Sequence, residues 1–195
     1  DHGQSWTPVA WVDTMLFYEL FLYGGYIYGA DYKGMYRTAD LGATWEFVHP
    51  LQFSYIQTDG QRITGSRHPF ILQSTDGGFS WDTLLQYNGS IVNLLQQDNF
   101  LFVFLHNAQG GCWVSDDYGQ SWVQHTGTGF NDVRGFAWHN GILFGFQSNE
   151  ILRSTDLGKS WQYQQPLQGD FPAMTGISTG DALLVSGYFA GVQRS

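Results

Sequence analysis

An eight-residue pattern recurs along the chain at nearly constant spacing and constrains its fold more than any other feature. The last full copy, Ser154–Trp161, reads Ser-Thr-Asp-Leu-Gly-Lys-Ser-Trp, and a shortened copy opens the chain at Asp1–Trp6. Earlier full copies span Thr38–Trp45, Ser74–Trp81 and Ser115–Trp122. The motif aspartates, at positions 1, 40, 76, 117 and 156, are separated by steps of 39, 36, 41 and 39 residues. Steps of about 40 residues with several short strands are typical of propeller blades.

Each position of the motif has a local chemical reason. The aspartate carboxylate can accept hydrogen bonds from N–H groups of its own turn, and the Ser or Thr that precedes the Trp can add another local bond. The glycine two residues after the aspartate can take the positive φ that other residues avoid. The Trp then begins a strand, with a large apolar surface and an indole N–H that needs a partner when it is buried.

The rest of the composition agrees with packed β-structure. Aromatic residues make up 17% of the 195 residues, and 25 are glycine. We expect a single all-β domain over residues 1–195, with repeats that begin near the five motif aspartates, and no window shows a helical period. The expected strands are Ser5–Ala10, Met15–Leu20, Tyr26–Asp31, Gly34–Thr38, Phe53–Thr58, Arg62–Arg67, Phe70–Ser74, Ile91–Gln96, Phe100–His106, Cys112–Ser115, Val133–Trp138, Ile142–Gln147, Ile151–Ser154, Met174–Thr179, Ala182–Gly187 and Gly191–Ser195.

The motif resembles the Asp box, or bacterial neuraminidase repeat, and the resemblance extends over the whole chain. This repeat occurs in sialidases, xyloglucan-degrading enzymes, sortilin-type receptor domains, a photosystem assembly factor and many secreted bacterial proteins. The resemblance implies a β-propeller or a propeller-like fold. It implies architecture rather than activity, because one fold can carry many functions.

The two ends of the chain together complete one repeat. Gly191–Ser195 matches the strand that precedes the motif aspartate elsewhere, as in Ile151–Ser154, and Asp1–Trp6 supplies the turn that follows. We therefore expect five four-stranded blades, with the N-terminal strand closing the ring by joining the C-terminal blade. Such closure removes an exposed sheet edge. The alternative is a segment of a larger propeller, and the start within a motif favours excision from a longer protein.

Charge and composition exclude several kinds of partner and cofactor. With 8 basic and 17 acidic side chains the net charge is −9, which disfavours nucleic acids and anionic membrane surfaces. No apolar run is long enough for direct insertion into a membrane. Cys112 is the only cysteine and is expected to be a buried thiol. The histidines have no metal-ligand spacing, and no phosphate loop or nucleophile elbow is present, so we expect no metal and no cofactor.

The resemblance divides the polar residues between two faces. In such propellers the motif turn lies on one rim, so the motif residues are expected to be structural: Asp1, Asp40, Asp76, Asp117 and Asp156, with Trp6, Trp45, Trp81, Trp122 and Trp161. Ligand contacts are expected on the opposite face, from loops of variable length. The main candidates there are Trp11, Asp31, Tyr32, Arg67, His68, Arg134 and Tyr188. Their aromatic and polar side chains suit a sugar or a polar peptide, although this composition would place such residues on any face.

A sialidase activity is not expected. Sialidases use three arginines, a Tyr–Glu pair, an acidic residue and a Phe/Tyr-Arg-Ile-Pro sequence, whereas the nearest string here is Gln61-Arg62-Ile63-Thr64. Three of the six arginines, Arg37, Arg153 and Arg194, stand at the repeated position before the motif. A glycosidase with two aspartates leaves no local motif, and Asp132 and Asp170 are the pair that such an enzyme would use.

These observations favour a non-catalytic binding or scaffolding propeller, located outside the cytoplasm, that engages a protein or a glycan through its loop face. The alternative is a glycoside hydrolase, or a fragment of one, that uses an aspartate pair.

Overall fold

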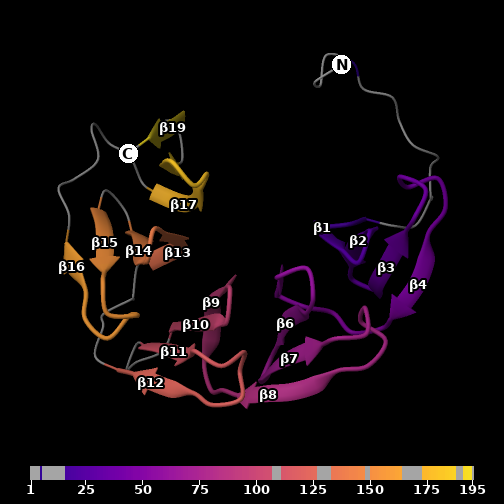
Figure 1. Ribbon diagram of the computed structural model, residues 1–195, viewed down its shortest axis with the longest axis horizontal. Helices are drawn as coiled ribbons and strands as arrows, with labels where there is room; N and C mark the ends of the chain where they lie inside the picture. The colour runs from indigo at the N-terminus through magenta and orange to yellow at the C-terminus, as the bar shows by residue number, and fades with distance from the viewer. Residues whose placement is uncertain are drawn as a thin grey trace. The chain divides into compact units, whose positions relative to one another are not determined.

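The computed structural model describes residues 5, 16–106, 111–126, 133–147, 150–163, 173–187 and 191–194. Within these ranges the chain forms strands and turns and no helix, which confirms the all-β prediction. The strands form five antiparallel sheets, four of four strands and one of three, and neighbouring strands in each sheet follow chain order (Figure 1). The chain divides into two compact units, residues 1–86 and 87–195.

The first unit holds two sheets. The first sheet contains β1 (Glu19–Tyr23), β2 (Tyr26–Asp31), β3 (Gly34–Thr38) and β4 (Glu46–His49), and the second contains β5 (Tyr55–Thr58), β6 (Ile63–Arg67), β7 (Phe70–Ser74) and β8 (Asp82–Gln86).

The second unit holds three sheets. They are β9 (Ser90–Gln97), β10 (Phe100–His106), β11 (Gly111–Ser115) and β12 (Val123–His125); β13 (Val133–His139), β14 (Ile142–Gln147), β15 (Glu150–Ser154) and β16 (Gln162–Tyr163); and β17 (Ala173–Ser178), β18 (Leu183–Gly187) and β19 (Gly191–Arg194).

Most expected strands lie within a residue or two of the observed ones, and one needs a correction. The strand expected at Met15–Leu20 is observed as Glu19–Tyr23 and continues to the Gly24–Gly25 turn. Phe17 instead precedes the strand, and its ring packs on Gly29, where an added Cβ would lie 2.7 Å from the ring. The strand expected at Ser5–Ala10 lies mostly outside the described residues.

Apolar side chains between consecutive sheets form the core of each unit. In the first unit Tyr28, Met35 and Val48 of the first sheet pack with Ile56 and Leu72 of the second. Two clusters do the same in the second unit, one between the sheets of β9–β12 and β13–β16 and the other between β13–β16 and β17–β19. Burial at about 25 cal/mol per Å² makes these faces the main stabilising contacts.

A glycine in the second strand lets the Phe–Trp pair of a sheet pack closely. Phe53 covers Gly65, where a Cβ would lie 2.3 Å from the ring, and its ring centroid is 4.6 Å from that of Trp81. Phe17 packs in the same way between Gly29 and Trp45. These glycines stand eleven residues before their motif aspartates (40 − 29 and 76 − 65).

The motif aspartate closes its turn with both carboxylate oxygens. In the last copy, Asp156 Oδ1 accepts the N–H of Ser160 at 2.9 Å and Oδ2 accepts its hydroxyl at 2.6 Å. The Ser154 hydroxyl donates to Asp156 Oδ1 at 2.8 Å and accepts the N–H of Gly158 at 2.8 Å. The other three described copies make the same four bonds, around Asp40, Asp76 and Asp117.

Two successive residues of the motif turn have positive φ. Leu157 and Gly158 have φ of 59° and 84°, and the N–H of Lys159 donates to the Asp156 carbonyl at 3.3 Å. This is the pattern of a type I′ turn. The expected glycine is thus accompanied by a second left-handed residue, which the sequence reading missed. The copy Ser74–Trp81 gives the signal, because Gly77 occupies that position.

The turn also provides a hydrogen-bond acceptor for the indole N–H of the Trp, and it sets the register of the third and fourth strands. The indole N–H of Trp161 donates to the Gly158 carbonyl at 3.0 Å, and Trp81 and Trp122 make the equivalent bonds. In all four described copies the residue three before the aspartate pairs with the residue six after it, as Arg153 does with Gln162.

Hydrogen bonds keep the motif carboxylates ionised. The pKa values of Asp40, Asp76 and Asp117 are lowered from 3.8 to about 2, chiefly by the hydroxyls of Thr44, Ser80 and Ser121. Desolvation raises the pKa of Asp156, but bonds from Ser160 and Ser154 outweigh it and lower that pKa to about 2 as well.

These pKa values predict a loss of stability in acid. The folded-state pKa lies below the unfolded value of about 3.9, so the stabilisation is complete above that pH and is lost as the pH falls towards about 2. Urea unfolding followed by Trp fluorescence at a series of pH values should show a midpoint that falls through this window. Asp156→Asn should show a smaller fall. A midpoint with the same pH dependence in wild type and variant would contradict the assignment.

Candidate functional site

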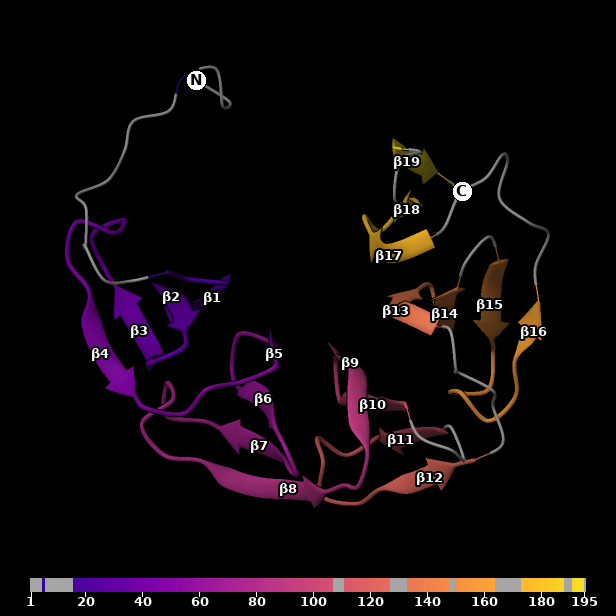
Figure 2. The same ribbon diagram turned by 180° about the vertical axis from the view of Figure 1, so that it is seen from behind.

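Each sheet has two chemically different ends. Because the strands alternate in direction, the motif turn shares one end with the turn between the first two strands, and we call this the motif end. The opposite loop end carries the turn between the second and third strands and the connection to the next sheet. Both ends of the sheet β5–β8 can be followed in Figure 2.

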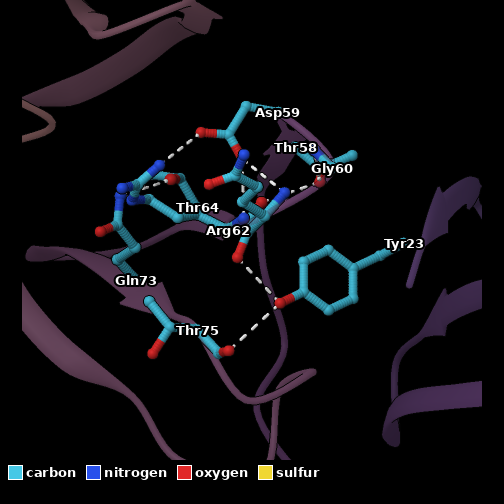
Figure 3. A network of polar contacts seen from close by, with 9 residues as sticks. Tyr23, Thr58, Asp59, Gly60, Arg62, Thr64, Gln73 and Thr75 are labelled. Atoms are coloured by element: carbon cyan, nitrogen blue, oxygen red, sulfur yellow. Dashed lines mark hydrogen bonds and ion pairs between the residues drawn. The ribbon is translucent and has the colours of Figure 1, made fainter.

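Polar groups at the motif end of β5–β8 bind one another (Figure 3). Asp59 Oδ1 accepts the N–H groups of Gln61 at 2.8 Å and Arg62 at 2.7 Å, and Oδ2 pairs with the Arg62 guanidinium at 3.0 Å. The Tyr23 hydroxyl, from the first sheet, lies 2.9 Å from the Gln61 carbonyl and 3.2 Å from that of Thr75. These groups therefore connect the two sheets of the first unit.

Arg37 also contacts groups of both sheets of the first unit. Its guanidinium pairs with Glu46 at 2.8 Å and lies over the rings of Tyr26 and Phe79, with centroid distances of 4.5 and 4.8 Å. Because Phe79 lies in the motif turn between β7 and β8 of the next sheet, Arg37 also joins two sheets.

In the second unit, His139 connects the first turns of two sheets. Its Nδ1 lies 2.8 Å from the Ser178 hydroxyl, and its Nε2 lies 3.1 Å from Nδ2 of Asn140. If Asn140 donates, Nε2 accepts and Nδ1 carries the proton.

The turn between β2 and β3 carries two of the predicted ligand residues at the loop end. Asp31 is fully buried, and its Oδ1 accepts the N–H groups of Lys33 at 2.7 Å and Gly34 at 3.1 Å. Its Oδ2 has no hydrogen-bond partner among the described residues. Tyr32 is 56% exposed, and its carbonyl accepts a bond from Gln52 in the connection to the next sheet. Asp31 thus shapes the turn, and Tyr32 presents a ring to solvent.

The turn between β6 and β7 carries two more candidates. Arg67 and His68 are both exposed there, at the loop end of the second sheet of the same unit. Arg134, also exposed, lies near the start of β13 at the loop end of a sheet in the other unit. The structure therefore places the candidates in adjacent pairs, Asp31 with Tyr32 and Arg67 with His68. Trp11, Asp132, Asp170, Tyr188, Asp1 and Trp6 lie outside the described residues.

Two groups near the start of β1 escaped the sequence reading. The Tyr18 hydroxyl donates to the Phe53 carbonyl at 3.1 Å. Desolvation raises the pKa of Glu19, against a bond from the N–H of Ile56 that lowers it. Both residues fell inside an expected strand, and no sequence signal distinguished them.

Within the described ranges, no three His, Cys, Asp or Glu side chains are grouped so that they could hold a metal ion. The same ranges contain no helix long and apolar enough to cross a membrane. Cys112 is fully buried, as expected, and burial raises the pKa of its thiol.

No protein-family model matches this sequence, and no curated protein matches it. Solved structures do match. A structure of YCF48 bound to D1 peptide aligns with 100% of this chain and 70% of its own, at 17% identity and a TM-score of 0.78. A nidogen/laminin complex aligns with 84% of this chain and 68% of its own, at 12% identity and a TM-score of 0.62.

An ancestral GH74 enzyme aligns with 84% of this chain at 16% identity and a TM-score of 0.61, but the match spans only 26% of the enzyme. At these identities the similarities establish the fold alone. Together with the all-β sheets, they support a β-propeller fold for this chain.

Proposed function

We propose that this chain is an Asp-box β-propeller whose ring has five blades, with the N-terminal segment providing the fourth strand of the last sheet. The four described motifs make one common set of bonds, in agreement with the Asp-box resemblance. The last sheet has three described strands where the others have four, and β19 is its edge. By motif position, Arg194 corresponds to Arg153 and Thr7 to Gln162. Because Arg153 pairs with Gln162, we expect Thr7 to pair with Arg194.

The first and last sheets each expose apolar side chains. Leu20 and Leu22 of β1 are 61% and 69% exposed, on the opposite side of the strand from Phe21 and Tyr23, which pack in the core of the first unit. Ile177 and Val192 of the last sheet are each 65% exposed. Pairing of β19 with the N-terminal segment would cover the open edge of the last sheet.

A disulfide tests this closure. Thr7→Cys with Arg194→Cys should crosslink within one chain, because directly paired residues have Cα atoms about 4.5–5.5 Å apart, within disulfide range. Arg194→Cys with Gln162→Cys is the matched control, since Gln162 already pairs with Arg153, and it should not crosslink. Non-reducing electrophoresis with peptide mapping identifies the bond. A crosslink only between chains, or none, would contradict ring closure within one chain.

We also propose that the domain is a non-catalytic module that binds a protein or peptide through its loop end, outside the cytoplasm. The observation that carries this proposal is the division between the ends: the motif aspartates and the Asp59–Arg62 pair bond within the fold at the motif end, whereas Tyr32 and Arg67 are exposed at the loop end. The comparisons add support, because YCF48 binds D1 peptide and nidogen forms a complex with laminin. Exposed aromatic and arginine side chains are frequent binding hot spots.

Two alternative functions, glycan binding and glycoside hydrolysis, lead to specific predictions. A glycan could stack on Tyr32 in place of a peptide. The similarity to a GH74 enzyme leaves the hydrolase alternative, with Asp132 and Asp170 as its predicted carboxylates. Hydrolysis would require these two to converge at about 5–9.5 Å.

Matched double variants test the loop end. Tyr32→Ala with Arg67→Ala removes one exposed tyrosine and one exposed cation there, and Tyr163→Ala with Lys159→Ala removes the same kinds of group elsewhere. The partner is first identified by crosslinking in the native source and is then purified. It should bind the Tyr32→Ala, Arg67→Ala variant at least about 30-fold more weakly than wild type, the effect of losing about 2 kcal/mol. It should bind the Tyr163→Ala, Lys159→Ala variant as tightly as wild type. Equal losses in both variants would contradict loop-end binding.

The same proteins on a glycan array, with the glycan masses measured afterwards, separate the alternatives. Intact bound glycans would replace the peptide proposal with a glycan-binding one. If the wild-type protein shortens the glycans and the Asp132→Asn variant leaves them intact, the hydrolase alternative is established instead.

A further inference from the structure

The chain contains two Asn-Gly pairs, and the structure places them in very different settings. Asn88-Gly89 lies in the connection between β8 and β9, at the loop end. Asn140-Gly141 forms the turn between β13 and β14, at the motif end. We propose that Asn88 is a site of spontaneous succinimide formation and deamidation in the folded protein, and that Asn140 is protected from the same reaction.

The reaction needs only the two residues and water. The backbone nitrogen of the glycine attacks Cγ of the asparagine side chain, a C–N bond forms, and the amide nitrogen leaves as ammonia with the transferred proton. Water then opens the five-membered succinimide at either carbonyl and gives aspartate or isoaspartate. A following glycine favours the attack because it has no Cβ to obstruct the approach and restricts the backbone least.

Nothing in the described structure holds Asn88 away from this geometry. Asn88 is exposed, and neither it nor Gly89 makes a hydrogen bond to a described residue. Gly89 has a φ of 121°, which L side chains rarely adopt. The connection is anchored on one side by the buried Tyr87 and on the other by Ser90, where β9 begins. The backbone between these anchors can therefore rotate to bring the Gly89 nitrogen to Cγ without breaking a strand bond.

Asn140, in contrast, is held by the hairpin. It has a φ of 50° and Gly141 a φ of 79°, so both occupy left-handed geometry in a two-residue turn between the paired residues His139 and Ile142. Its Nδ2 also lies 3.1 Å from His139 Nε2, and His139 is in turn bonded to Ser178. Attack would require Asn140 to leave the left-handed region, which would open the turn and break these contacts.

Deamidation at Asn88 would change the loop end chemically. Aspartate adds one negative charge there, and isoaspartate also inserts one methylene into the backbone just before β9. Any effect on partner binding rests on the proposed loop-end function, whereas the chemical conversion does not.

Incubation of the folded wild-type protein in mildly alkaline buffer tests the proposal. Peptides from a chymotryptic digest are followed by mass spectrometry, with electron-based fragmentation to distinguish isoaspartate. We expect Asn88 to convert on the order of tenfold faster than Asn140 or more, because each 1.4 kcal/mol needed to open the hairpin costs a factor of ten. In urea-unfolded protein the two rates should converge, and Asn88→Gln should abolish the change at that position.

Two outcomes would overturn the proposal. Equal conversion of the two asparagines in the folded protein would show that the turn does not protect Asn140. An Asn88 that stays intact in the folded protein, over a time in which the unfolded chain converts, would show that the connection is held.

Discussion

The structure depends on one interaction, a carboxylate that accepts both the N–H and the hydroxyl of the residue four positions later. In Asp156 these two bonds fix the turn, and the Ser154 hydroxyl holds the same carboxylate from the other side. The turn must pass through two left-handed residues, a conformation that costs an L residue such as Leu157 about 1–2 kcal/mol. The carboxylate bonds offset this cost, and they set the register in which the third and fourth strands pair.

Once the turns are fixed, contacts between neighbouring sheets complete each unit. Apolar faces provide most of the stabilisation, and side chains at the motif end add directional bonds, such as the Tyr23 hydroxyl at the carbonyls of the next sheet. The motif aspartates and the polar groups bonded to them therefore have structural roles at the motif end. At the loop end, Tyr32 and Arg67 face solvent, and loops of this kind can vary in sequence without loss of the fold.

Repetition explains how much of the fold the sequence predicts. The motif fixes the turn before each fourth strand, and Gly or Asn fixes many of the others, so strands such as Tyr26–Asp31 and Phe100–His106 follow with correct bounds. The sequence predicts a strand that includes Phe17, whereas in the structure Phe17 precedes β1 and packs on Gly29 of β2, a contact that no local pattern displays. Every full copy of the motif begins with Ser or Thr, but the sequence does not show that this hydroxyl both donates to the motif carboxylate and accepts the N–H of the motif glycine.

The candidate site was less predictable. The repeat indicates which end of each sheet carries the loops, and Tyr32, Arg67 and His68 do lie there. The burial of Asp31 could not be read from the sequence, because it depends on how its turn folds against its surroundings. Ligand identity has no local signature either, since aromatic and polar side chains suit peptides and sugars alike.

The most direct measurement is urea unfolding of Asp156→Ala beside Thr155→Ala. Thr155 is an exposed neighbour in the same turn, and its position is occupied by Ala39 in the copy Thr38–Trp45. We expect Asp156→Ala to lower the free energy of unfolding by about 1.5–3 kcal/mol, the range for hydrogen bonds to a charged group, with solvent exposure favouring the lower end. Thr155→Ala should leave the midpoint nearly unchanged. Equal midpoints for the two variants and wild type would contradict the central role of the carboxylate.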